Sequence, residues 1–226
     1  MEVTLQDLLP PYSKQQPIQT PRLTLRPFQW NDLQSLYKLR TSPEVMQWTS
    51  QAQIDKSPQQ TREWMQNFID ETDIPRRNYN FVVCLRADNG DNHPDEHSPD
   101  SSPQDNSLLI GVCGLTGLDS LPISPLPPFG YMFFPETWGK GYATEAALGF
   151  QRAWMSLISL GLQIHSIPSD LKHDLFDIRA VTLESNLPSA KVLRKCGWRI
   201  YETVDEGDKK LLRWILDGRS NFDPSS

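Results

Sequence analysis

The residues from Phe129 to Phe150 constrain the fold more than any other part of the chain. An unbroken apolar run, FGYMFF, is followed by PETWGKGY and then by apolar residues at helical spacing. This order predicts a strand buried on both faces in the middle of a sheet, a tight turn, and a long helix that packs one face on that sheet. The residues of that helix face are Ala143, Ala146, Ala147, Phe150, Trp154, Leu157 and Ile158.

Two glycines, Gly139 and Gly141, stand where this helix begins. Glycine in a helix is less stable than alanine by roughly 1 kcal/mol, so two of them suggest that bare backbone is needed here. A helix N-terminus has four backbone N–H groups without partners and a partial positive charge, and can hold a phosphate group. Lys140 would add positive charge. A tight turn with a surface lysine explains the same residues equally well.

Two nucleotide-binding motifs are excluded at this turn. The motif GxxxxGK[ST] requires glycine at position 134 and Ser or Thr at position 141, where the chain has Phe134 and Gly141. The pattern GxGxxG does not occur at the turn either, which removes the main support for a dinucleotide fold. We therefore do not expect a nucleoside triphosphate held by such a loop.

The remaining patterns predict a single α/β domain of the α+β type, with a mixed sheet and the element order βααβββαβαββ. Asn31 or Asp32 can cap the first helix, which runs to about Arg40, and Ser57 followed by Pro58 can start the second. In the last helix Asn186 stands near the N-cap, Ala190 and Leu193 face inward, and Gly197 ends it. The predicted strands are residues 22–28, 79–86, 107–118, 129–134, 177–185, 199–204 and 209–216.

The net charge of −6 comes from one segment, residues 87–107, which contains six acidic residues and no Lys or Arg. The other 22 acidic residues balance the 22 basic ones. This polar segment predicts a disordered insert between two strands. His93 and His97 have metal-like spacing within it, but without a second ligand pair we expect no metal site. Since no basic patch occurs elsewhere, nucleic acid is not an expected partner.

At 226 residues the chain is long enough for one core or at most two small domains. No apolar run approaches the ~20 residues that span a membrane, and the N-terminus lacks a signal-peptide pattern. We therefore expect a soluble, cytoplasmic protein without membrane partners. Its three cysteines, Cys84, Cys113 and Cys196, are odd in number and lie among apolar residues, which predicts reduced, buried thiols.

Two motifs together resemble those of the GNAT acetyltransferases, specifically the branch of ribosomal-protein alanine and serine N-acetyltransferases. They are PETWGKGYATEA and, some forty residues later, AVTLESNLPSAKVLRKCGW. That branch has Q/R-x-x-G-x-G/A at the long helix and N-x-x-S-x-x-x-L-x-x-x-G-F/W later. The resemblance implies a seven-stranded, mostly antiparallel sheet, splayed in the middle and flanked by helices. It places an N-acetyltransferase domain at 20–217, between an N-terminal extension at 1–19 and a tail at 218–226.

The resemblance also implies acetyl-CoA as the cosubstrate, with no metal. Its pyrophosphate would lie at the helix start, and its pantetheine arm would lie as an extra strand beside the strand at Phe129. Asn186 would anchor the arm from the other side, although a plain helix N-cap explains this residue equally well. The implied binding residues are Tyr131, Met132, Phe133, Trp138, Gly139, Lys140, Gly141, Tyr142, Ala143, Thr144 and Asn186.

The implied reaction is direct attack of a primary amine on the thioester. Many family members have a Glu base on the strand before the glycines and a Tyr acid in the later helix. FGYMFF contains no Glu, and Leu193 stands at the position of the Tyr. Ser189 is the candidate acid, although it can also be a helix-surface serine. The base is unassigned, with Glu136, Glu184 and Asp208 as weak candidates that solvated charges or caps explain as well.

The acceptor amine is the part of this hypothesis that the sequence leaves open. A protein or peptide N-terminus leads, a small-molecule amine on the same fold is the second hypothesis, and a non-catalytic CoA-binding module is the third. The expected assembly is a monomer or a homodimer. Four tryptophans are candidates for an acceptor groove or for core packing, namely Trp30, Trp48, Trp64 and Trp214.

Overall fold

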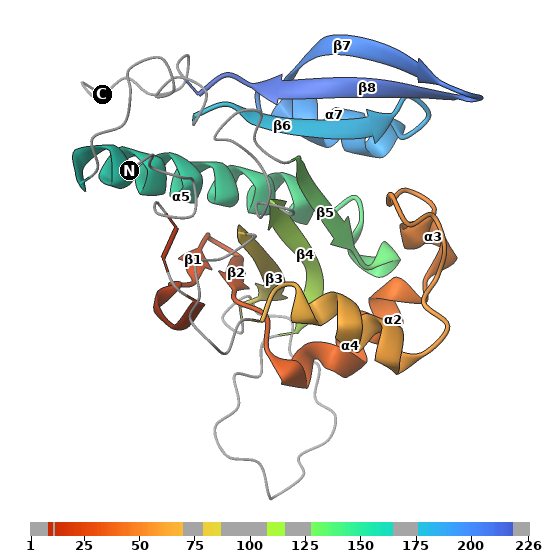
Figure 1. Cartoon of the computed structure of the whole chain (residues 1–226), viewed down its shortest axis with the longest axis horizontal. Coiled ribbons are helices and arrows are strands. Elements are labelled where there is room, and N and C mark those ends of the chain that lie inside the picture. The colour runs from red at the N-terminus through yellow and green to blue at the C-terminus, as the bar shows by residue number, and fades with distance from the viewer. Residues whose placement is uncertain are drawn as a thin grey trace, which may run out of the picture.

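The computed structural model describes residues 9–10, 12–69, 79–86, 108–115, 128–164 and 176–218. Its strands form a five-stranded sheet in the order β1-β2-β3-β4-β5 and a three-stranded sheet in the order β6-β8-β7. The predicted element order is confirmed, and a two-residue strand, β1, and a one-turn helix, α3, are added to it. The architecture is a single mixed α/β domain, as the sequence predicted (Figure 1).

All strand pairs within the two sheets are antiparallel. The sheets meet at one parallel bridge, between Pro128 and Arg179, beyond which β5 and β6 diverge. We call this divergence the splay. The strands are β1 (Ile18–Gln19), β2 (Leu23–Arg26), β3 (Tyr79–Leu85), β4 (Leu109–Leu115), β5 (Phe129–Phe133), β6 (Ile178–Leu183), β7 (Arg199–Glu206) and β8 (Lys209–Leu216).

Side-chain caps start two helices where the sequence predicted them, whereas Asp32 stands at the N-cap of α2 without a side-chain cap hydrogen bond. The Ser57 hydroxyl accepts a hydrogen bond from the backbone N–H of Gln60, and Asn186 Oδ1 accepts one from the N–H of Ser189. Gly197, with φ +84°, follows the end of the last helix. The helices are η1 (Tyr12–Lys14), η2 (Trp30–Asp32), α2 (Leu33–Arg40), α3 (Pro43–Met46), α4 (Pro58–Gln66), η3 (Pro135–Thr137), α5 (Tyr142–Ile164) and α7 (Leu187–Lys195).

The five-stranded sheet is covered on both faces. Because side chains alternate along a strand, Phe81 and Val83 of β3 lie in the cluster that includes α5, while Val82 and Cys84 lie in the cluster that includes α2 and α4. Figure 1 shows α5 between the two sheets and α2 and α4 on the side away from β6–β8. The long helix therefore links both sheets and holds the splay at a fixed place.

The prediction that the strand at Phe129 is buried on both faces is wrong. Strand β5 is the last strand of the five-stranded sheet, and its Gly130 is exposed while Tyr131 and Met132 are only partly buried. The strands buried along almost their whole length are β3 and β4. An apolar run indicates burial but not which neighbours bury it, and β6 leaves the edge of β5 after a single bridge.

Several sequence predictions lie outside the described residues, among them the acidic insert at 87–107 with His93 and His97. The three cysteines are free and buried, as predicted. None of the helices in the described ranges has the length and apolar character to cross a membrane. In the same ranges no three His, Cys, Asp or Glu side chains gather as metal ligands.

Candidate functional site

The turn before α5 has backbone geometry that only glycine adopts easily. Gly139 has φ +75° and Gly141 has φ +85°, both in the left-handed region. A Cβ atom on Gly139 would meet no atom within 4 Å, so the backbone is open to solvent on that side. The positive φ angles explain why glycines stand here, and the open side is what an anion would need. The tight turn and the accessible backbone are thus present together.

The start of α5 supplies the donors for such an anion. The first backbone hydrogen bond of the helix joins Glu145 N–H to Gly141 O at 3.0 Å. The N–H groups of Tyr142, Ala143 and Thr144 precede this bond and have no partner in the helix ladder. The helix is 23 residues long, so its N-terminus has the full partial positive charge of the macrodipole. The exposed Lys140 adds a unit charge at the turn.

A carboxylate in the first turn, Glu145, would oppose an anion if it were unpaired. Its Oε1 accepts hydrogen bonds from the Thr20 hydroxyl at 2.6 Å and from Arg22 N–H at 2.8 Å, and its Oε2 accepts one from Arg22 Nε at 2.7 Å. Burial acts to raise the pKa of Glu145, but the hydrogen bonds from Thr20 and Arg22 and the charge of Arg22 together lower it. The charge of Glu145 is therefore stable and compensated.

Arg22 also holds the turn itself. Its Nη1 donates to Lys140 O at 3.1 Å, and its guanidinium lies over the Tyr142 ring, 4.6 Å from the centroid. The residue just before β2 thereby fixes a turn that lies more than a hundred residues away in the sequence. Sequence reasoning missed both Arg22 and Glu145. A Glu in the first turn of a helix, close to the glycines, is the signal that could have pointed to them.

The edge of β5 that faces the splay diverges from β6 beyond the start of the strand. Gly130 is exposed, and a Cβ atom there would meet no atom within 4 Å. In the described part of the chain, this edge pairs with β6 at the bridge between Pro128 and Arg179. Trp138, which is 46% exposed, folds back so that its indole N–H donates to Phe133 O at 2.8 Å. The glycine turn is thus held against the end of β5.

The other wall of the splay is the start of α7. Asn186 is buried, and its Oδ1 accepts from Ser189 N–H at 3.1 Å, so the helix-cap explanation of this residue is correct. Ser189 is partly exposed, and its side chain lies close to the Tyr131 hydroxyl of β5. Leu193, by contrast, is buried in the core. The structure therefore brings the N-x-x-S motif and β5 together, which the sequence predicted only through its resemblance.

The three candidate bases are exposed to solvent rather than enclosed in the site. Glu136 and Asp208 are exposed, in η3 and in the β7–β8 turn. Glu184 is also exposed and forms an ion pair with Lys210 at 3.4 Å. Carboxylates surrounded by solvent are poorly placed to take a proton from an amine held beside β5. None of the three is enclosed beside β5.

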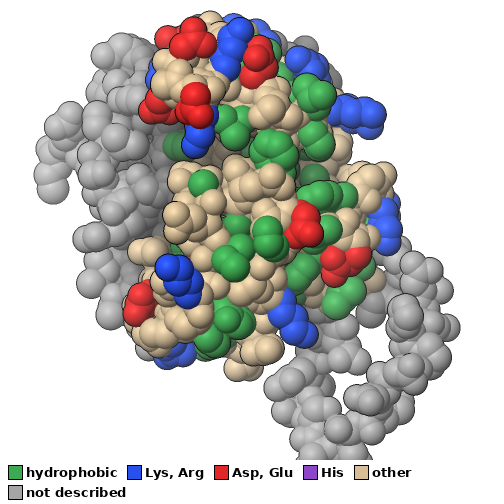
Figure 2. Space-filling model, turned by 90° about the vertical axis from the view of Figure 1, so that its right-hand side faces the viewer, with side chains coloured by type: hydrophobic (Ala, Val, Ile, Leu, Met, Phe, Trp, Pro, Cys, Tyr) green, Lys and Arg blue, Asp and Glu red, His purple; other side chains and the backbone are tan. Residues whose placement is uncertain are grey.

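Figure 2 shows the side of the molecule on which, in Figure 1, the β7–β8 hairpin lies above and α3 lies below. Apolar side chains gather across the middle of this face, between the charged hairpin above and the helices below.

Of the four tryptophans considered for an acceptor groove, Trp214 is fully buried and belongs to the core, whereas Trp48 is 39% exposed. Trp30 and Trp64 are partly buried and stack with Arg62 and Arg40. Core packing therefore explains Trp214.

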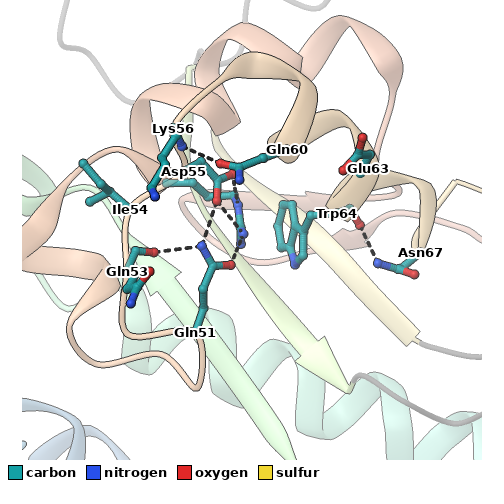
Figure 3. Close-up of a pocket in the computed structure, with 10 residues that line it drawn as sticks. Gln51, Gln53, Ile54, Asp55, Lys56, Gln60, Glu63, Trp64 and Asn67 are labelled. Atoms are coloured by element: carbon teal, nitrogen blue, oxygen red, sulfur yellow. Dashed lines mark hydrogen bonds and ion pairs between the residues drawn. The ribbon is translucent and has the colours of Figure 1, made fainter.

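A separate hollow of about 530 Å³ lies beside α4 (Figure 3). At its base Arg40 donates to Asp55 through Nε at 2.7 Å and through Nη2 at 3.0 Å, and Gln51 and Thr61 complete the network. These partners satisfy the buried charges and tie the loop before α4 to α2. The residues that line the hollow are Arg40, Gln51, Gln53, Ile54, Asp55, Lys56, Gln60, Glu63, Trp64 and Asn67. None of the predicted binding residues lines it.

Comparisons with solved structures agree with this fold. An acetyltransferase of the GNAT family from Bacillus anthracis is 18% identical, with a TM-score of 0.61 over 90% of this chain and 99% of that chain. RimL, a ribosomal-protein alpha-N-acetyltransferase in complex with coenzyme A, is 12% identical, with a TM-score of 0.63 over 89% and 98%. A spermidine N-acetyltransferase from Vibrio cholerae, in complex with CoA and spermine, is 17% identical, with a TM-score of 0.55 over 88% and 98%. Identities this low establish the fold alone.

The family itself is established by sequence. No curated protein matched the chain. The family model described as an acetyltransferase (GNAT) domain matches residues 22–199, which is well over half of the chain and includes both motifs around the splay. The chain therefore belongs to the GNAT acetyltransferase family.

Proposed function

We propose that this protein transfers the acetyl group of acetyl-CoA to a primary amine, and that the amine is the N-terminus of a protein or peptide. The observation that carries this proposal is the turn before α5. Gly139 and Gly141 lead with positive φ into a 23-residue helix whose first N–H groups lie outside the helix ladder. The pyrophosphate of coenzyme A is an anion that such a turn would bind through backbone N–H groups. Membership of the GNAT acetyltransferase family supports acetyl as the group that is transferred.

The rest of the cosubstrate would lie along the splay. The backbone of Tyr131, Met132 and Phe133 would take the pantetheine arm as an added strand, because β6 leaves this edge after a single bridge. From α7, Asn186 would contact the arm through its amide NH₂ group, because its Oδ1 already accepts from Ser189 N–H. The residues at the site thus fit the cosubstrate without a change of fold.

The chemistry would be direct transfer. The amine nitrogen attacks the thioester carbon, and a backbone N–H of β5 would stabilise the oxygen as negative charge develops. The bond from carbon to sulfur then breaks, and Ser189 would protonate the leaving sulfur. An α-amino group has a pKa of about 8, so a part of it is already unprotonated at neutral pH. A chain of waters leading to solvent would therefore suffice as the base.

A protein N-terminus is supported by the exposed apolar side chains on either side of the splay. Trp138 precedes the glycine turn and is 46% exposed, and Leu187 follows Asn186 and is 70% exposed. Such side chains suit the uncharged side chains of a peptide better than a polycation. The fold shared with RimL, at 12% identity, agrees with this acceptor class. The similarity to a spermidine N-acetyltransferase, at 17% identity, favours a small polyamine as the second candidate.

Two measurements test the proposal. Calorimetric titration with acetyl-CoA, NADH and ATP should give binding for acetyl-CoA alone. Release of free CoA thiol is then followed with short peptides that begin with Ser or Ala, with the same peptides already acetylated at the N-terminus, and with spermidine. Turnover with the free peptides alone supports the proposed acceptor, whereas turnover with spermidine alone supports the second candidate. A folded protein that does not bind acetyl-CoA would contradict both.

A further inference from the structure

The Tyr131 hydroxyl has no role in the site as described so far. It is buried, and it makes no hydrogen bond of normal geometry with any residue in the described ranges. Most buried polar groups are paired in folded proteins, because an unpaired group has lost its water without compensation. Phenylalanine at this position would avoid that cost and keep the same packing. The hydroxyl therefore calls for a functional explanation.

The surroundings of the hydroxyl restrict what it can do. Burial raises the pKa of Tyr131 to about 12, the nearby Ser189 side chain lowers it less, and Cys196 adds to the rise. Burial also raises the pKa of the Cys196 thiol to about 11, and its Sγ lies 3.7 Å from Thr144 O. Both groups thus stay protonated at neutral pH. The phenol is therefore available as a hydrogen-bond donor.

The hydroxyl is also held in a fixed place. Tyr131 pairs with Cys113 of β4, and its ring lies between those of Phe129 and Phe133, at centroid distances of 6.0 and 6.1 Å. On the opposite wall, the N-cap bond from Ser189 N–H to Asn186 Oδ1 fixes the Ser189 backbone. The Ser189 side chain is the flexible member of the pair, since it can change rotamer while both backbones stay in place.

We propose that Tyr131 is a positioning residue, whose O–H donates to Ser189 Oγ and turns the Ser189 proton toward the leaving sulfur. This inference rests on the proposed acetyl transfer. In the step itself the amine nitrogen forms its bond to carbon, the bond from carbon to sulfur breaks, and sulfur takes the electron pair and the Ser189 proton. Ser189 regains a proton from the water that removes one from the amine. Tyr131 loses no proton at any point.

The test is a double-mutant cycle on full-length protein with Tyr131→Phe and Ser189→Ala. Tyr131→Phe removes one oxygen atom and leaves the packing intact. It should lower kcat by about 10- to 100-fold, as small errors of alignment do, with acetyl-CoA affinity and KM for the amine within twofold of wild type. Its melting temperature should stay the same or rise. On the Ser189→Ala background the same change should have no further effect on kcat.

Tyr201→Phe is the matched control, because Tyr201 lies on β7, is 41% exposed and has its ring beside Arg179. It should leave kcat within twofold of wild type. The proposal is overturned if Tyr131→Phe keeps a wild-type kcat, if its effect adds fully to that of Ser189→Ala, or if it weakens acetyl-CoA binding instead. Wild-type protein that binds no acetyl-CoA would overturn the proposed function as well, so the two failures are distinguishable.

Discussion

Arg22 and Glu145 are 123 positions apart in the chain, yet Arg22 Nε and Glu145 Oε2 lie 2.7 Å from each other. The pair joins the residue just before β2 to the first turn of α5, directly beside the glycine turn. Because the Arg22 side chain is 40% exposed, the pair contributes little to the free energy of unfolding. Its importance lies in geometry, since the same guanidinium holds Lys140 O.

The first prediction concerns this geometry. Arg22→Ala should weaken acetyl-CoA binding by roughly tenfold, because the turn loses its contact at Lys140 O and Glu145 is left as an uncompensated negative charge near the anion. The melting temperature should change by only a few degrees. Calorimetry and thermal unfolding measure the two effects. Arg213→Ala, which removes an exposed pair with Glu202, is the control and should leave binding unchanged. Equal affinity in both variants would contradict the assignment.

The second prediction separates backbone strain from ligand binding at Gly141. Gly141→Glu should abolish acetyl-CoA binding, because the side chain fills the turn and adds like charge to the pyrophosphate. It should also destabilise the protein by roughly 1–2 kcal/mol, since φ is +85° at this position. Gly207→Glu is the matched control, with φ +64° in a distant hairpin turn and open space around it. The control should lose similar stability in urea titrations and keep its acetyl-CoA affinity.

The third prediction concerns the buried pair of Arg40 and Asp55, whose side chains are 5% and 2% exposed. Asp55→Ala should destabilise the fold by about 3–5 kcal/mol, because it leaves the buried guanidinium without a counter-charge. Urea unfolding followed by circular dichroism measures the change. Glu202→Ala at the exposed pair with Arg213 is the comparison and should cost about 0–1 kcal/mol. Similar costs at the two pairs would show that the network beside α4 is not a structural anchor.

Local patterns predicted the fold well where the cause is local. Ser57, Asn186 and Gly197 were identified as caps or helix ends because each acts within three residues of its own position. The position of β5 was predicted incorrectly because its burial depends on β6, which diverges after one bridge. Strand partners are a property of the whole chain, and a single apolar run does not specify them.

The same distinction holds for the candidate site. The glycine turn could be predicted because its positive φ angles depend on the glycines of the turn itself. The contacts of Glu145 with Arg22, and of Tyr131 with Ser189, join segments far apart in the sequence. No spacing rule links such residues without an alignment or a structure. Long-range contacts are therefore what the structure adds to the site.

The last prediction is a pH dependence of stability that originates at Glu145. Its pKa is lowered in the folded state, against about 4.3 in an unfolded chain. A depressed folded pKa gives stability that is fully present above the unfolded value and is lost as pH falls through the folded one. The difference in unfolding free energy between wild type and Glu145→Gln should therefore be constant above about pH 5 and shrink below pH 4. Urea titrations from pH 7 to pH 3 measure it, with Glu136→Gln, an exposed carboxyl, as the control whose difference stays small throughout. A difference that grows as the pH falls would show that Glu145 is not ionised in the folded protein, and the description of the Arg22 pair would then be wrong.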